Sequence, residues 1–189
     1  MVYLSCWLYP DAIVMLGVDR ADVFQQPWTF LTYSFANISP IHLSANVIAL
    51  LIAGSWFRCY GSDTQLIVNY IFGAVGGALI YVCVTPHSVL LGSSASVFAI
   101  VSAAVVLSKS WKIMTLPILM LAIGIDGENS GGMIAHFGGI AAGILFGFIT
   151  NKLNISGPNM VLEKAMQSGY VSLSESERRS LSSYNGVEK

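Results

Sequence analysis

Five long apolar runs follow one another between residues 41 and 150, and they constrain the fold more than any other feature. They cover residues 41–57, 65–84, 93–108, 110–125 and 133–150. Only 10% of the chain is charged, against about a quarter in an ordinary soluble domain, and its mean hydropathy is +0.68. A helix rises about 1.5 Å per residue, so these runs lie at the lower end of what crosses a hydrocarbon core of about 30 Å. The sequence therefore predicts a bundle of short membrane-spanning helices.

The two ends of the chain differ from this apolar middle. A sixth span at 1–17 is interrupted by Pro10 and Asp11, so we expect it to be short or partial. From about residue 151 the composition turns polar, and Ser174 stands three residues before Glu177, the spacing of a helix capping box. We therefore expect an all-α, multi-pass transmembrane helical bundle of six spans over residues 1–150, followed by a polar tail over 151–189. The tail is either a capped helix or a mobile segment.

Two polar side chains interrupt the apolar runs at membrane depth. Ser94 lies in the segment Leu-Gly-Ser-Ser-Ala-Ser-Val-Phe, and His136 in Ile-Ala-His-Phe-Gly-Gly. A polar group in hydrocarbon is costly, so it usually faces a cavity or a partner and marks a functional site. Together the two residues are the parts of a serine nucleophile and its base. Taken alone, Ser94 could belong to a small-residue face on which another helix packs. His136 taken alone could be a hydrogen-bonded core histidine or a proton relay.

Glycine spacing indicates where the histidine points. Gly139, Gly143 and Gly147 recur every four residues, so they form a smooth face, shared with His136, on which another helix can pack closely. The small-residue helix that begins at Ser94 is the natural partner. Phe98 follows Ser94 by four residues, and either packs against the imidazole or is an ordinary core aromatic.

A second polar pair lies on an earlier span. His42 and Asn46 are four residues apart, so they share one helical face. Both side chains can donate hydrogen bonds to a developing oxyanion, the interaction that contributes most in acyl transfer. The alternative is hydrogen bonding between helices.

These motifs resemble those of the rhomboid intramembrane serine proteases. Gly92-Ser-Ser94-Ala is similar to their Gly-x-Ser-x nucleophile motif, and His42-x-x-x-Asn46 to their second-helix motif. The sixth-helix motif is matched by Ala-His136-x-x-Gly139-x-x-x-Gly143, and the segment Pro-Trp-Thr-Phe-Leu-Thr-Tyr from residue 27 resembles the preceding aromatic loop. The resemblance covers about 25–150. It implies that Ser94 is the nucleophile, that His136 is the general base of a dyad without an acid, and that His42, Asn46 and the Ser94 amide form the oxyanion hole.

The resemblance implies cleavage of peptide bonds in or next to the transmembrane segments of other membrane proteins. The expected partners are these substrates and the lipid bilayer, and the sequence leaves the oligomeric state undefined. It has no Cys/His cluster for a metal, no phosphate-binding glycine loop for a cofactor and no basic patch for nucleic acid. One alternative is a proteolytically inactive rhomboid-like protein that binds client transmembrane helices. Another is a small transporter with His136 as proton relay.

Basic residues predict the orientation of the spans, because Lys and Arg are enriched in cytoplasmic loops. With the C-terminus in the cytoplasm, Arg20 is the one basic residue outside. The residues on the inner side are Arg58, Lys109, Lys112, Lys152, Lys164, Arg178, Arg179 and Lys189. Ser94, His136, His42 and Asn46 then all lie in the outer halves of their helices. We expect a bacterial inner-membrane protein with a cytoplasmic C-terminus.

Topology-reporter fusions test this orientation. Fusions after Lys112 and Lys152 should report a cytoplasmic location, whereas fusions near Pro86 and Glu128 should report an external one. Reversed signals would place Ser94 and His136 toward the cytoplasmic face and contradict the assignment.

Overall fold

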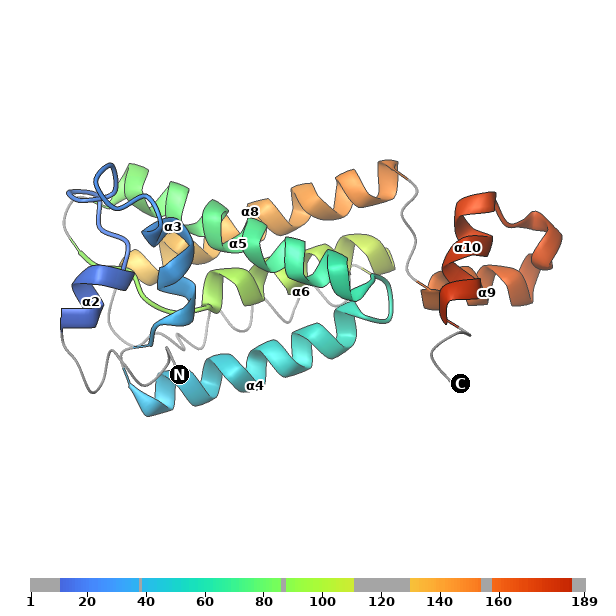
Figure 1. The fold of residues 1–189 in the computed structure, drawn as a ribbon, viewed down its shortest axis with the longest axis horizontal. Helices are drawn as coiled ribbons and strands as arrows, with labels where there is room; N and C mark the ends of the chain where they lie inside the picture. Colours follow the sequence, from blue (N-terminus) through green and yellow to red (C-terminus); the bar gives the residue numbers. More distant parts are fainter. Residues whose placement is uncertain (1–10, 38, 86–87, 111–129, 154–157, 185–189) are drawn as a thin grey trace.

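The computed structural model describes residues 11–37, 39–85, 88–110, 130–153 and 158–184 (Figure 1). Apart from one bridge between Val18 and Leu90, these residues form helices, turns and loops. The elements before the long helices are α2 (Asp11–Leu16), α3 (Thr29–Thr32) and the 3-10 helix η1 (Tyr33–Phe35). The long helices are α4 (Pro40–Phe57), α5 (Asp63–Val84), α6 (Ser94–Ser108) and α8 (Ser130–Lys152), and the tail holds α9 (Pro158–Ser168), η3 (Tyr170–Ser172) and α10 (Glu175–Tyr184).

Four of the predicted spans are helices with bounds close to those expected. The runs at 41–57, 65–84, 93–108 and 133–150 correspond to α4, α5, α6 and α8. Three of these helices, α4, α5 and α8, are long and apolar enough to cross a membrane. α6 has 15 residues, or about 22 Å, and is shorter than a bilayer core. The predicted span at 110–125, apart from its first residue, and most of the one at 1–17 lie outside the described residues.

Local signals in the sequence set the helix ends. The Ser39 hydroxyl accepts the N–H of His42 at 3.1 Å, and Pro40 occupies the first turn of α4. A capping box between Ser62 and Gln65 begins α5. α6 ends where Lys109 adopts a left-handed conformation with φ of 54°.

α6 lies at the centre of the bundle, and every residue from Ala95 to Leu107 is buried. Figure 1 shows α4 on one side of it and α5 with α8 on the other, and all three pack against it. Its sequence is a run of small and β-branched residues with no polar face. A helix that is apolar all round is buried by its neighbours, which is the position α6 takes.

The outer surfaces of the other three long helices are apolar. Large hydrophobic side chains are exposed along each of them, among them Ile48, Leu51 and Ile52 on α4, Ile67, Leu79 and Ile80 on α5, and Leu145, Phe148 and Ile149 on α8. Contiguous apolar surface of this kind is not stable against water and marks a lipid-facing or protein-facing side. The outer surface of the bundle is therefore of the kind that faces lipid or another protein.

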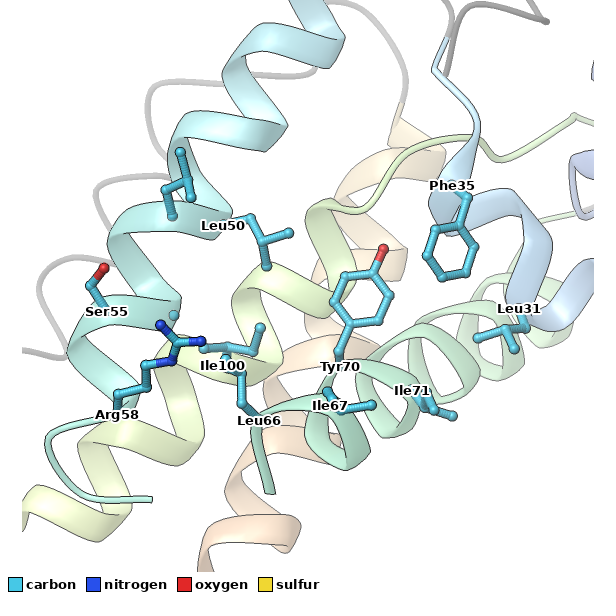
Figure 2. A pocket seen from close by; sticks show the side chains of 12 residues that line it. Leu31, Phe35, Leu50, Ser55, Arg58, Leu66, Ile67, Tyr70, Ile71 and Ile100 are labelled. Atoms are coloured by element: carbon cyan, nitrogen blue, oxygen red, sulfur yellow. The ribbon is translucent and has the colours of Figure 1, made fainter. Parts of the chain in front are cut away.

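An apolar groove of about 450 Å³ opens between α4 and α5 (Figure 2). Its lining contains neither a histidine nor a carboxylate. The Arg58 guanidinium at one end is paired with Asp63 at 2.7 Å, and the Tyr70 hydroxyl donates to the Ser34 carbonyl at 3.0 Å. The groove therefore provides an apolar concave surface for binding, but no lining side chain that could act as a base in hydrolysis.

The tail contains a capped helix, one of the two alternatives that the sequence left open. The Glu177 N–H donates to the Ser174 hydroxyl at 3.3 Å, and the Ser174 N–H donates to the Glu177 carboxylate at 2.7 Å. Lys164 of α9 donates to the same carboxylate at 2.8 Å, which joins α9 to α10. The Lys164 ammonium, together with the backbone hydrogen bond from Ser174, lowers the pKa of Glu177 to about 2.

The depressed pKa predicts that acid loosens this helix pair. The stabilisation is complete above the pKa of an unfolded glutamate, about 4.3, and disappears as the pH falls toward 2. Hydrogen-exchange protection of α9 and α10 in the full chain, corrected for intrinsic rates, should therefore fall between pH 6 and pH 3. Glu177→Gln should remove most of this dependence, whereas the exposed Glu175→Gln should keep it. Equal protection at both pH values in the wild type would contradict the prediction.

Candidate active site

Ser94 is the first residue of α6. The loop before it needs, at position 92, a backbone conformation that glycine adopts readily. Gly92 has a φ of 118°, which side chains rarely adopt, and its N–H donates to the Tyr33 carbonyl at 3.0 Å. The loop is thus tied to η1 and delivers the Ser94 hydroxyl, half-buried, at the end of the central helix.

The structure brings together Ser94 on α6 and His136 on α8, which are 42 residues apart in the sequence. The Nε2 atom of His136 lies 2.8 Å from the Ser94 Oγ, within hydrogen-bond distance. The His136 side chain is buried, with 5% of its surface exposed. A hydroxyl and an imidazole in this relation form the pair that nucleophilic catalysis requires.

Glycines on α8 make this approach possible. A Cβ on Gly139 would collide with the Ala95 carbonyl, and one on Gly143 would collide with the Ala99 carbonyl. The two helices are therefore in backbone contact directly beside the pair, with Gly147 continuing the same face against Val106. The small-residue stripes predicted to meet do so, and their contact sets the distance between Ser94 and His136.

Phe98 holds the imidazole from one side. Its ring centroid is 4.5 Å from that of His136, the planes are tilted by 35°, and the side chain is 2% exposed. Ring contact at this distance restricts rotation of the imidazole and keeps Nε2 directed at Ser94.

His42 and Asn46 lie on the first turns of α4 and reach the same loop. The Asn46 Nδ2 is 3.2 Å from the His42 Nε2, and Asn46 is buried. A Cβ placed on Gly92 would be only 2.6 Å from the His42 ring and 3.4 Å from the Asn46 Nδ2. Both side chains therefore lie beside the backbone two residues before Ser94.

One residue of this cluster has no counterpart in the sequence analysis. The Asn46 Nδ2 donates to the Asn37 Oδ1 at 2.8 Å, and Asn37 is 1% exposed. Asn37 lies in the irregular segment between η1 and α4, where no helical period relates it to Asn46. An amide shortly before a Ser-Pro helix start was its only signal, and such residues are common in loops.

The cluster combines a hydroxyl, an imidazole and side-chain N–H donors in a largely buried site, as acyl transfer requires. Among the described residues, no group of three His, Cys, Asp or Glu side chains is arranged to hold a metal ion.

Comparison with known proteins gives a consistent family match. Residues 25–153 match the Rhomboid domain family. The chain is 24% identical over 147 residues to human Rhomboid-related protein 3, an alignment that covers 66% of this chain and 36% of that protein. It is 26% identical over 142 residues to Rhomboid-related protein 1 of Caenorhabditis elegans, covering 66% of this chain and 40% of that protein. The chain thus spans about two fifths of the length of these relatives, both from animals, which lend no support to the bacterial origin expected above.

The glycine contact predicts a site-specific cost of adding one methyl group. Gly139→Ala places a Cβ against the Ala95 backbone, so α8 must move from α6, and overpacking of this kind costs about 1–3 kcal/mol. We expect a lower thermal unfolding midpoint. Gly54→Ala on α4 is the matched control, because its Cβ would meet Leu66 at an ordinary 3.6 Å, and its midpoint should be unchanged or higher. Equal midpoints for the two variants would contradict the close contact.

Proposed function

Because the chain belongs to the rhomboid family, we propose that it is an intramembrane serine protease that hydrolyses peptide bonds in or next to transmembrane segments of other membrane proteins. The observation that carries the proposal is the 2.8 Å separation between the His136 Nε2 and the Ser94 Oγ. Family membership and the apolar helices indicate an integral membrane protein. We infer its substrates from membership of the family.

In the proposed first step, the Ser94 Oγ attacks the carbonyl carbon of the scissile peptide bond. His136 Nε2 takes the hydroxyl proton as the new C–O bond forms. The imidazolium is held in place by the Phe98 ring, which lies 4.5 Å away between ring centroids. His136 then gives the proton to the departing amine, and the acyl group remains on Ser94.

The negative oxygen of the tetrahedral intermediate needs N–H donors at the position where charge develops. We assign this role to His42, Asn46 and the Ser94 backbone amide. The position of Gly92 against His42 and Asn46 supports the assignment, because it places these donors beside the loop that carries the nucleophile. The proposed second half of the reaction reverses the proton path, with His136 activating the water that releases the acyl group.

A rhomboid-like protein that binds client helices without cleaving them is the alternative. Its helix-binding surface would not depend on Ser94, and the apolar groove between α4 and α5 is a surface of that kind. The two functions separate in one experiment, since only the protease requires a reactive hydroxyl.

The dyad predicts the outcome of that experiment on purified protein in detergent. A fluorophosphonate probe should label the wild type, and Ser94→Ala should abolish both labelling and cleavage of a model transmembrane substrate. His136→Ala should lower cleavage by about 10²–10⁴, the contribution of a positioned general base. Binding of the substrate helix should persist in both variants.

Neighbouring serines provide the matched controls. Ser93 and Ser96 flank Ser94, both are buried, and the Ser96 hydroxyl donates to the Tyr70 carbonyl at 2.9 Å. Their alanine variants should keep labelling and most of the cleavage per folded molecule. Binding without labelling or cleavage in the wild type would support the alternative, and cleavage by Ser94→Ala at the wild-type rate would exclude the dyad.

A further inference from the structure

We propose that Asn37 is a positioning residue for the oxyanion hole, acting through Asn46; this inference rests on the proposed protease function. The Asn37 Oδ1 accepts a hydrogen bond from the Asn46 Nδ2 at 2.8 Å, and both side chains are buried. Asn37 is hydrogen-bonded to the Asn46 amide group that is proposed to donate to the oxyanion, so it influences the direction in which that amide points.

The terminal torsion of an asparagine is soft, and its amide presents an acceptor on one side and a donor on the other. If the Asn46 amide turned over, its carbonyl oxygen would face the developing oxyanion and repel it. The Asn37 acceptor prevents this by engaging one Asn46 N–H. The same nitrogen lies 3.2 Å from the His42 Nε2, so its second N–H lies on the side of His42, where we place the developing oxyanion.

The segment that carries Asn37 is held firmly enough to serve as a reference point. The Tyr33 hydroxyl donates to the Ala74 carbonyl at 2.8 Å, and the Tyr70 hydroxyl of α5 donates to the Ser34 carbonyl at 3.0 Å. The Tyr33 carbonyl in turn accepts the Gly92 N–H of the nucleophile loop. One short segment therefore connects α5, the loop before Ser94 and the amide of Asn46. Positioning of this kind reduces reorganisation when charge develops.

The other half of the Asn37 amide adds no hydrogen bond to the stability of the segment. Its Nδ2 is buried and makes no hydrogen bond within the part of the chain that the structure describes. An unpartnered buried donor costs folding free energy. The half of the Asn37 amide that is paired is the half that contacts Asn46.

A double-mutant cycle tests the inference in the full chain, with rates expressed per active site labelled by a fluorophosphonate probe. Asn37→Ala should lower kcat for a model transmembrane substrate about tenfold, less than the 10²–10³ typical of losing an oxyanion donor, and leave KM within about twofold. In an Asn46→Ala background the same change should lower kcat by less than about twofold, because the group it orients is gone.

Two further variants separate positioning from folding. Asn37→Leu keeps the side-chain volume without the acceptor, and should lose as much kcat as Asn37→Ala while retaining more thermal stability. Asn69→Ala on α5 is the matched control, since Asn69 is also fully buried but donates to the Ala99 carbonyl at 3.3 Å. It should lower the unfolding temperature and keep kcat per labelled site.

The outcomes distinguish this inference from the function on which it rests. Absence of Ser94-dependent cleavage in the wild type would overturn the protease assignment. With that cleavage present, a kcat within twofold of wild type in both Asn37 variants would overturn the positioning role. A full tenfold loss in the Asn46→Ala background would also overturn it, because Asn37 would then act independently of Asn46.

Discussion

The backbone contact between α6 and α8 is the constraint on which the rest of the site depends. Gly139 and Gly143 allow the carbonyls of Ala95 and Ala99 to approach so closely that a methyl group would not fit. Without a hydrophobic driving force between helices in lipid, such dispersion contact and helix-to-helix hydrogen bonds hold a bundle together. The contact that stabilises the bundle therefore also fixes the distance between His136 and Ser94, and stability and chemistry share one set of residues.

A central, fully buried α6 explains how polar groups are tolerated in an apolar bundle. Ser96 donates to the Tyr70 carbonyl and Asn69 donates to the Ala99 carbonyl, so these polar groups meet protein backbone. The segment at residues 33–37, in which the 3-10 helix η1 is followed by irregular backbone, is held by tyrosine hydroxyls in the same way. Non-helical backbone at membrane depth is stable only when protein or water satisfies it. The surrounding helices supply that environment here.

Much of this arrangement could be predicted from the sequence, because helical periodicity relates residues on one element. Four spans, the shared face of His136 and Gly139, and the pairing of His42 with Asn46 all follow from spacings of three or four residues. Asn37 could not be found in this way, since its contact with Asn46 depends on how an irregular segment turns before α4. The groove between α4 and α5 was also unpredictable, because a void reflects how helices diverge in space.

The length of α6 has a consequence for the depth at which a substrate peptide bond would have to reach Ser94. Lys109, at the far end of the helix, is charged and exposed and belongs at the boundary with water. In a bundle that spans a hydrocarbon core of about 30 Å, a helix of about 22 Å with Lys109 at one boundary would leave Ser94 roughly 8 Å beneath the opposite boundary. A substrate held as a regular helix at that depth would keep its carbonyls engaged in its own hydrogen bonds. Local unwinding of the substrate, and a route for water down to Ser94, would therefore be physical requirements of the proteolysis proposed for this site.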